Sequence, residues 1–331
     1  MDILRKQFAK SVGVLLALVS FASVAADNAP VTVQIVDLMN KLYGAHPGFR
    51  ANHAKGLVVE GSFKASAEAA KLSRATLFDG SAIPVTVRFS DAGGVPNIPD
   101  GSADANPHGM AIKFHLPGGA DTDMVINSLK FFPVATGEDF RDLLRAISES
   151  PADAPKPTKL EQFVAGHPSV PKALATISTP DSWADEEYYG IDAFILVSKG
   201  GHKQAVRYIM APQTLVHLTP AEAATKAPDF LLDDLPKRLA QKPVSFHLKA
   251  QLAEPGDQTK DPSQPWPDTR KVVELGVLTL NKAVADSLAA QKKLLFLPTR
   301  LTAGIELSDD PLVPVRSAAY GVSYSRRNVP Q

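Results

Sequence analysis

Alternation of apolar and polar side chains predicts a fold built on β-strands. Eight segments combine this two-residue repeat with β-branched or aromatic enrichment, the pattern of a half-buried strand. They cover residues 57–64, 84–90, 109–116, 123–127, 192–198, 204–210, 244–252 and 272–280. The strands come in two groups of four, an order that favours antiparallel hairpins over a parallel sheet with alternating helices. We therefore expect an α+β fold, with a closed eight-stranded antiparallel β-barrel and helical insertions.

Helical periodicity is confined to short segments around this barrel. Residues 138–148 repeat apolar side chains every three or four positions, as in an amphipathic helix, between the two groups of strands. A Pro-rich stretch follows, and residues 150–190 are predicted to run as an extended wrap. A second short helix is expected at residues 283–292, and residues 298–314 are expected to be irregular.

The first 25 residues predict an export signal. Basic residues precede an apolar run from Val12 to Phe21, and Ser23-Val24-Ala25 forms a small-x-small cleavage site. The run is short for a membrane span. We expect a cleaved signal peptide at 1–25, a mature chain of residues 26–331 in the periplasm, and no membrane association after cleavage.

Composition excludes several classes of chemistry. The sequence contains no cysteine, which removes disulfides, zinc–thiolate sites and thiol-based peroxidases. Its 35 basic and 35 acidic residues balance, and no basic run suits nucleic acid. No Gly-rich phosphate loop precedes a helix, so nucleotide chemistry has no support. A small-molecule partner is the default expectation.

A candidate metal ligand lies near the C-terminus. Arg316 and Tyr320 are four residues apart and share one face if the segment is helical. A free phenol titrates near pH ~10 and binds Fe(III) poorly until it loses its proton. A fixed cation beside the phenol favours the deprotonated form. The pair can therefore hold a tyrosinate ligand, although the same spacing also fits an ordinary surface pair.

Polar side chains at three other points need partners. His53 comes immediately before the first strand and is followed by small residues, which leaves its ring room to project into the barrel mouth. Arg88 and Ser90 share the polar face of the second strand, where the arginine needs an anion. Asn127 ends the fourth strand, before two phenylalanines. Taken singly, each has an ordinary structural explanation, such as a loop histidine or a turn asparagine.

Together these segments resemble the catalase superfamily. Five of its motifs occur in order, as His-Ala-Lys-Gly at 53–56, Val-Arg-Phe-Ser at 87–90, Asp-x-Val-x-Asn at 123–127, Gly-Ile-Glu-x-Ser at 304–308 and Arg-x-x-x-Tyr at 316–320. The resemblance spans residues 53–327, nearly the whole mature chain. It implies a barrel of the catalase type over about residues 55–281, followed by a short C-terminal helical tail.

The resemblance also implies a haem cofactor, expected to be haem b. Tyr320 would be the axial ligand of the haem iron, on a proximal helix at about residues 312–326, and Arg316 would keep its phenol deprotonated. Buried haem carboxylates require cationic partners. The residues that would hold the propionates and the ring are Arg50, Arg88, Arg327 and Phe132.

On the opposite side of the haem, the resemblance assigns the catalytic groups. His53 would act as the acid–base residue, Asn127 would orient bound peroxide, and Ser90 would fix the histidine ring. We also consider an influence of His108 on one haem edge, because the family pattern usually carries arginine there.

Departures from full-length catalases refine the expected activity. Asp192 stands where catalases usually show histidine, and Ser128-Leu-Lys replaces the residues that usually follow Asn127. The chain also ends eleven residues after Tyr320, whereas typical catalases continue. These features resemble the small catalase-related peroxidases. They imply a monomer or small homo-oligomer that reduces hydrogen peroxide or small organic peroxides with small organic electron donors, with little or no catalase activity.

Three alternatives stay open from the sequence. A minimal true catalase would disproportionate hydrogen peroxide. An exported haem carrier would bind haem without turnover, although it needs neither His53 nor Asn127. An enzyme similar to allene oxide synthases would act on fatty acid hydroperoxides through a long apolar channel.

Overall fold

The computed structural model describes residues 28–328, so the predicted signal peptide lies outside the described residues. Within the described part, no helix is long and apolar enough to cross a lipid bilayer. The division of the chain at residue 25 stays a prediction.

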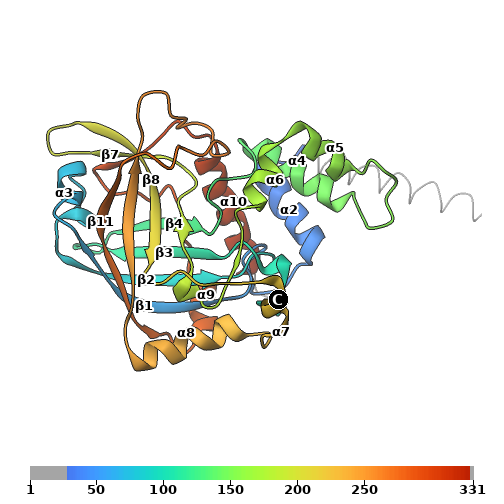
Figure 1. The fold of residues 1–331 in the computed structure, drawn as a ribbon, viewed down its shortest axis with the longest axis horizontal. Coiled ribbons are helices and arrows are strands. Elements are labelled where there is room, and N and C mark those ends of the chain that lie inside the picture. The colour runs from blue at the N-terminus through green and yellow to red at the C-terminus, as the bar shows by residue number, and fades with distance from the viewer. Residues whose placement is uncertain (1–27, 329–331) are drawn as a thin grey trace, which may run out of the picture.

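Within residues 28–328, eight strands close into an antiparallel ring (Figure 1). The ring runs β10-β11-β1-β2-β3-β4-β6-β8, and β8 pairs back with β10. Its strands are β1 (Gly56–Ala65), β2 (Ala82–Ser90), β3 (Gly109–His115), β4 (Asp121–Asn127), β6 (Tyr188–Tyr189), β8 (Lys203–Pro212), β10 (Val244–Leu252) and β11 (Val272–Ala283). The predicted closed eight-stranded barrel with helices is thus confirmed.

One predicted strand lies outside the ring. The segment expected at residues 192–198 is β7 (Phe194–Val197), which pairs with β8 and with β12 (Ile305–Leu307). The ring is instead completed by β6, whose two residues pair with β8 and whose Tyr189 also pairs with Asn127 of β4. Two residues are too few to show an alternating pattern, so sequence periodicity missed this strand. A separate pair joins β5 (Thr179–Pro180) and β9 (His217–Leu218).

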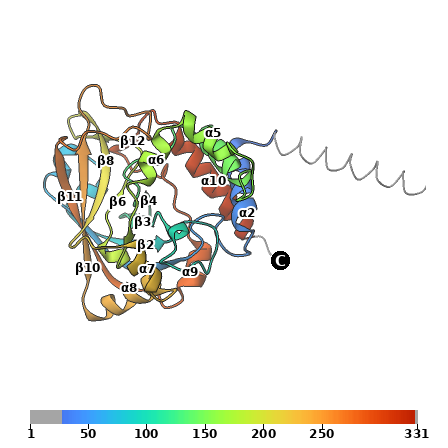
Figure 2. The same ribbon diagram turned by 45° about the vertical axis from the view of Figure 1, so that its right-hand side comes forward.

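Helices α2, α4, α5, α6 and α10 gather on one side of the barrel (Figures 1 and 2). The predicted amphipathic helix is α4, and the proximal helix is α10, whose first residue and last residue agree with the expected range to within one position. The described helices are α2 (Val31–Tyr43), α3 (Ala69–Leu72), α4 (Gly137–Ser148), α5 (Lys159–Gly166), α6 (Ser169–Leu174), α7 (Pro220–Thr225), α8 (Phe230–Gln241), α9 (Ser287–Lys293) and α10 (Leu312–Arg327), with single 3₁₀ turns at Thr76–Phe78, Ala103–Ala105 and Trp183–Asp185.

The extended wrap predicted for residues 150–190 is wrong where α5 and α6 form. A capping box starts α5, since the Thr158 hydroxyl accepts a hydrogen bond from the Glu161 amide at 3.1 Å and the Glu161 carboxylate accepts one from the Thr158 amide at 2.7 Å. Phe163 and Val164 then pack against the apolar face of α4. The prolines of this stretch favour extended chain, but α6 carries Pro171 in its first turn, where a helix tolerates proline.

Two boundaries near the C-terminus also differ from expectation. The helix expected at 283–292 begins at Ser287, because β11 continues to Ala283, which pairs with Val59 of β1. The segment expected to be irregular at 298–314 contains β12, which pairs with β7. Both differences reflect strand pairing with distant residues, which local periodicity does not report.

The barrel interior is filled by side chains. In β2, Val87 and Phe89 point inward and join one large apolar cluster, as expected for a ring of eight strands. Arg88 and Ser90 alternate with them and therefore point outward. The expectation that His53 projects into the barrel mouth is wrong, because the open space lies outside the wall, where α2 and α10 cover β2, β3 and β4.

Candidate functional site

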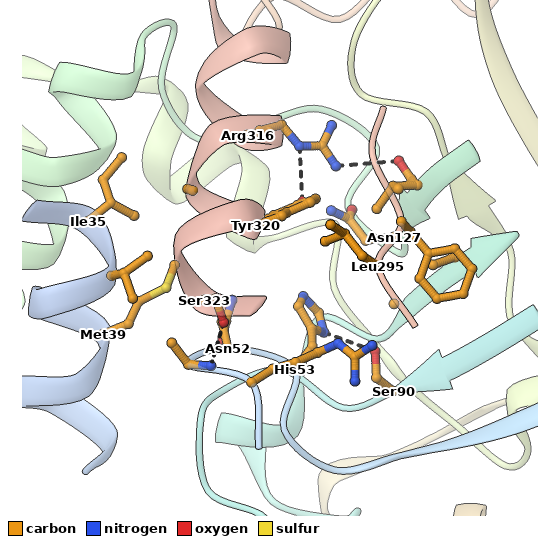
Figure 3. Close-up of a pocket in the computed structure, with 18 of the residues that line it drawn as sticks. Ile35, Met39, Asn52, His53, Ser90, Asn127, Leu295, Arg316, Tyr320 and Ser323 are labelled. Carbon is orange, nitrogen blue, oxygen red and sulfur yellow. Dashed lines mark hydrogen bonds between the residues drawn. The ribbon is translucent and has the colours of Figure 1, made fainter. Parts of the chain in front are cut away.

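A cavity lies between the outward faces of β2, β3 and β4 and the helices α2 and α10 (Figure 3). Its empty volume is about 1190 Å³, counting the part open to solvent. Residues from separate parts of the chain converge on this mainly apolar cavity, which is the usual character of a cofactor site. All nine residues predicted for the site line it, namely Arg50, His53, Arg88, Ser90, Asn127, Phe132, Arg316, Tyr320 and Arg327. Their roles stay predictions.

His53 is held in one orientation. Its Nδ1 lies 2.9 Å from the backbone oxygen of Asp91 and 3.1 Å from Oγ of Ser90. A carbonyl oxygen can only accept a hydrogen bond, so Nδ1 carries the proton and Nε2 keeps its lone pair. The backbone of His53 adopts φ 55°, a strained left-handed conformation that persists where surrounding contacts enforce it.

Burial keeps this imidazole neutral. It lowers the pKa of His53 from 6.5 to about 4, and the nearby charge of Arg88 acts in the same direction. Gly109 lies directly behind the ring, where an added Cβ would be 3.1 Å from His53 Nδ1 and 2.8 Å from Ser90 Oγ. The absence of a side chain at Gly109 therefore allows the ring and the hydroxyl to pack together. The result is a fixed, neutral imidazole at neutral pH, with Nε2 able to accept a proton.

Asn127 presents its amino group to the cavity. Its Oδ1 accepts a hydrogen bond from the backbone amide of Leu129 at 2.9 Å. With the oxygen occupied, the NH₂ group is the part of the amide left for a ligand, as a donor. Phe132 lines the same cavity and packs on Phe140, with ring centroids 5.2 Å apart.

Tyr320 faces the cavity from the side opposite His53 (Figure 3). One turn earlier on α10, Nε of Arg316 donates to the phenol oxygen at 3.3 Å, so the predicted pair is formed. The other end of the guanidinium pairs with the Asp192 carboxylate. Burial alone would lower the pKa of Arg316, but the Asp192 carboxylate and the Tyr320 phenol raise it above its usual value. Arg316 is therefore a permanent cation at the phenol oxygen.

Asp192 is the main residue of this arrangement that sequence reasoning missed. It is only 2 % exposed and comes from the loop between β6 and β7, 124 positions before Arg316. The sequence has an aspartate at this position, where the family usually has histidine, but no local pattern indicates which residue the carboxylate contacts. A buried arginine needs such a partner, and that requirement was the available signal.

Three arginines gather at one edge of the cavity without a carboxylate. Arg50 and Arg327 each donate to the backbone oxygen of Leu294, at 2.9 and 2.6 Å, and Arg88 donates to Gln291 Oε1 at 2.7 Å. None of the three forms an ion pair within residues 28–328, and Nε of Arg327 has no hydrogen-bond partner there.

These guanidinium groups affect one another. Burial and the charge of Arg327 lower the pKa of Arg88 to about 9, and burial lowers that of Arg327 to about 10. For Arg50, burial is the largest cause of a lowered pKa, followed by the charges of Arg88 and Arg327. Uncompensated buried cations are costly, so this edge is built for an anionic group. Two haem propionates fit that requirement, and the apolar walls fit the ring.

Behind His53 lies a second polar layer. His108 is fully buried, and its Nδ1 is 3.1 Å from the Asp91 carboxylate, whose backbone oxygen holds His53. His108 does not line the cavity, so it reaches the site through Asp91 rather than directly. The residues described here contain no cluster of three or more His, Asp or Glu side chains that could hold a metal ion.

Comparisons with known proteins agree with this fold. A family model described as "Catalase" matches residues 25–330. A catalase-related peroxidase from Mycolicibacterium paratuberculosis is 36% identical over 299 residues, covering 89% of this chain and 94% of that protein. One from Synechococcus elongatus is 34% identical over 319 residues, covering 95% and 94%. A solved fungal catalase has a TM-score of 0.76 at 21% identity, and the match covers 86% of this chain and 60% of that one, which shows the fold alone.

Proposed function

The chain belongs to the catalase family, and from that premise we propose that it is a haem peroxidase. It reduces hydrogen peroxide or small organic peroxides with small organic electron donors, and it has little or no catalase activity. One observation carries this proposal: His53 and Tyr320 line the same cavity from opposite sides. His53 is neutral and held in one orientation, and the Tyr320 phenol accepts a hydrogen bond from Arg316. The two catalase-related peroxidases that match over 94% of their own length support the peroxidase activity over the catalase activity.

The cavity would hold haem b through three groups of contacts. Tyr320 would ligate the iron, the carboxylate-free arginines Arg50, Arg88 and Arg327 would pair with the propionates, and Phe132 would pack near the ring. When bound, haem supplies the redox-active iron at which the peroxide O–O bond is cleaved. Arg316 holds a positive charge at the Tyr320 oxygen, which favours the phenolate over the phenol.

His53 transfers the proton of the peroxide, and Asn127 orients the peroxide. The Nε2 lone pair of His53 takes the proton from the inner peroxide oxygen and returns it to the outer oxygen, which leaves as water or alcohol. The amino group of Asn127 donates a hydrogen bond that orients the peroxide. Ser90 and Asp91 keep the imidazole from rotating. Two donor molecules then supply one electron and one proton each, so that one peroxide becomes one alcohol, or water, plus one water.

An absorption spectrum of the purified mature chain tests this function. We expect a high-spin ferric haem band that shifts on adding peroxide and returns on adding a phenolic donor. A haem band that ignores peroxide would instead support a carrier. Oxygen evolution fast enough to rival donor oxidation would support a minimal true catalase, and a strong preference for fatty acid hydroperoxides would support an allene oxide synthase-like enzyme.

We further propose that the protein is exported to the periplasm after loss of residues 1–25, on the basis of the N-terminal sequence pattern. The mature protein is proposed to be a monomer or small homo-oligomer. N-terminal sequencing of protein from the periplasmic fraction should start near residue 26, and retention of the first 25 residues would contradict the proposal. Light scattering would give the oligomeric state.

A further inference from the structure

We propose that a second, cationic cavity beside the haem site binds the negatively charged group of an aromatic electron donor. This inference rests on the proposed peroxidase function and adds the chemical class of the donor. The cavity has an empty volume of about 1130 Å³, counting its open part. Its walls come from α2, from the loop that follows α2, from Lys292 of α9 and from the last turn of α10. Figure 2 shows the C-terminal end of α10 beside α2, on the side of the molecule where α9 lies.

The second cavity is continuous with the first at the arginine edge. Both are lined by Val36, Arg50, Ala51, Ser323 and Arg327. Two of these shared residues, Arg50 and Arg327, are among the arginines at which the haem propionates are proposed to lie. A small aromatic molecule in the second cavity would therefore lie next to the haem edge, where an electron can pass to the haem without entry into the peroxide side.

The charged side chains that line the second cavity are all basic. Its lining includes His46, Arg50, Lys292, Arg326 and Arg327 but no aspartate or glutamate. Arg326 is paired with Asp37 at 2.6 Å, which leaves its charge compensated. Lys292 forms no ion pair within the described residues and is exposed.

Two propionates would not neutralise this edge. Arg50, Arg88 and Arg327 contribute three charges, and Lys292 adds a fourth, against two carboxylates. Three of these cations, Arg50, Arg327 and Lys292, line the second cavity, so two propionates would leave at least one positive charge there unpaired. An anion is the ligand that such a surface attracts, and it would gain most at Lys292, which no haem carboxylate needs.

The loop opposite Lys292 gives that side chain room. Gly48 has φ +81°, and an added Cβ there would lie 3.2 Å from Cε of Lys292. The end of the lysine side chain thus lies beside Gly48, and both residues line the cavity. Glycine at position 48 therefore leaves the space that the end of the Lys292 side chain occupies at the cavity wall.

A matched pair of phenols tests this site. The probes are 4-hydroxyphenylacetate, which is anionic, and 4-hydroxyphenylacetamide, which is neutral and otherwise nearly the same. In the haem-loaded enzyme, Lys292→Gln should raise the KM for the anion roughly three- to fivefold, the scale of one exposed charge pair, and leave the neutral phenol unchanged. Lys293→Gln is the control, because Lys293 is the exposed neighbour on the same helix turn and lines neither cavity.

Equilibrium dialysis of the anion against haem-loaded protein, without peroxide, provides a readout other than activity. We expect its Kd to rise by the same factor in Lys292→Gln only. Equal effects of the two lysine variants, or an equal change for both phenols, would overturn the anion site. If the wild type binds no haem or does not oxidise the neutral phenol, the proposed peroxidase function fails. In that case, dialysis of the anion against the wild type and both lysine variants still shows whether the second cavity binds anions through Lys292.

Discussion

Replacing His53 by glutamine should change how the stability of the protein depends on pH. Burial lowers the pKa of His53 from 6.5 to about 4, so between these values the unfolded chain binds a proton at this residue and the folded protein does not. Protonation thus favours the unfolded state. The wild-type protein loses stability as the pH falls from 6.5 towards 4, and it loses no more from this residue below that range.

The size of the effect follows from the two pKa values. One pKa unit corresponds to ~1.36 kcal/mol, so this histidine alone should cost about 3 kcal/mol when the pH is below both values. Between pH 7 and pH 5 the expected part is about 2 kcal/mol. Glutamine does not titrate, so the His53→Gln protein should lack this part of the pH dependence while keeping all others.

Urea denaturation of both proteins at pH 7 and pH 5 measures the difference. The free energy of unfolding of the wild type should fall by about 2 kcal/mol more than that of His53→Gln. Comparing the two pH values within each protein removes the constant effect of the lost hydrogen bond to Asp91. If both proteins lose the same stability, burial does not hold the imidazole neutral between pH 7 and pH 5, and the account of His53 as a buried neutral base is wrong. The variant should also lose turnover by ~10²- to 10⁴-fold.

Three other substitutions test the remaining parts of the site. Tyr320→Phe should abolish the haem absorption band of the purified protein, because the side chain that would ligate the iron is gone; an unchanged band would contradict the ligand assignment. Asp192→Asn should lower the free energy of unfolding by ~3–5 kcal/mol, since it leaves the guanidinium of Arg316 buried without its carboxylate, and an unchanged denaturation midpoint would show that the pair is dispensable. Gly109→Ala should reduce peroxidase turnover while haem binding is retained, because its Cβ would displace the ring of His53. Gly166→Ala is the control, since a Cβ there meets no atom within 4 Å, and it should leave turnover unchanged. Equal rates in the two variants would refute the packing argument.

Local patterns predicted the strands well for a physical reason. Strands with one buried face must alternate apolar and polar residues, so this repeat marks them without knowledge of their partners. The same repeat put Phe89, which packs in the barrel core, on the opposite face from Arg88 and Ser90, which line the cavity. It could not predict β6, which is too short to show a repeat. The helix α5 also differs from the prediction, because its capping box lies within a Pro-rich stretch that favours extended chain.

The sequence by itself determined which side chains share a face and which motifs occur in order, including the Arg316–Tyr320 pair one helical turn apart. Only the tertiary structure decided that the faces carrying these residues point outward from the barrel and meet under α2 and α10. It also joined Arg316 to Asp192 and Arg88 to Gln291, pairs separated by 124 and 203 positions. Alternation reports the two sides of a strand, but which side is covered, and by what, depends on the packing of segments far apart in the chain.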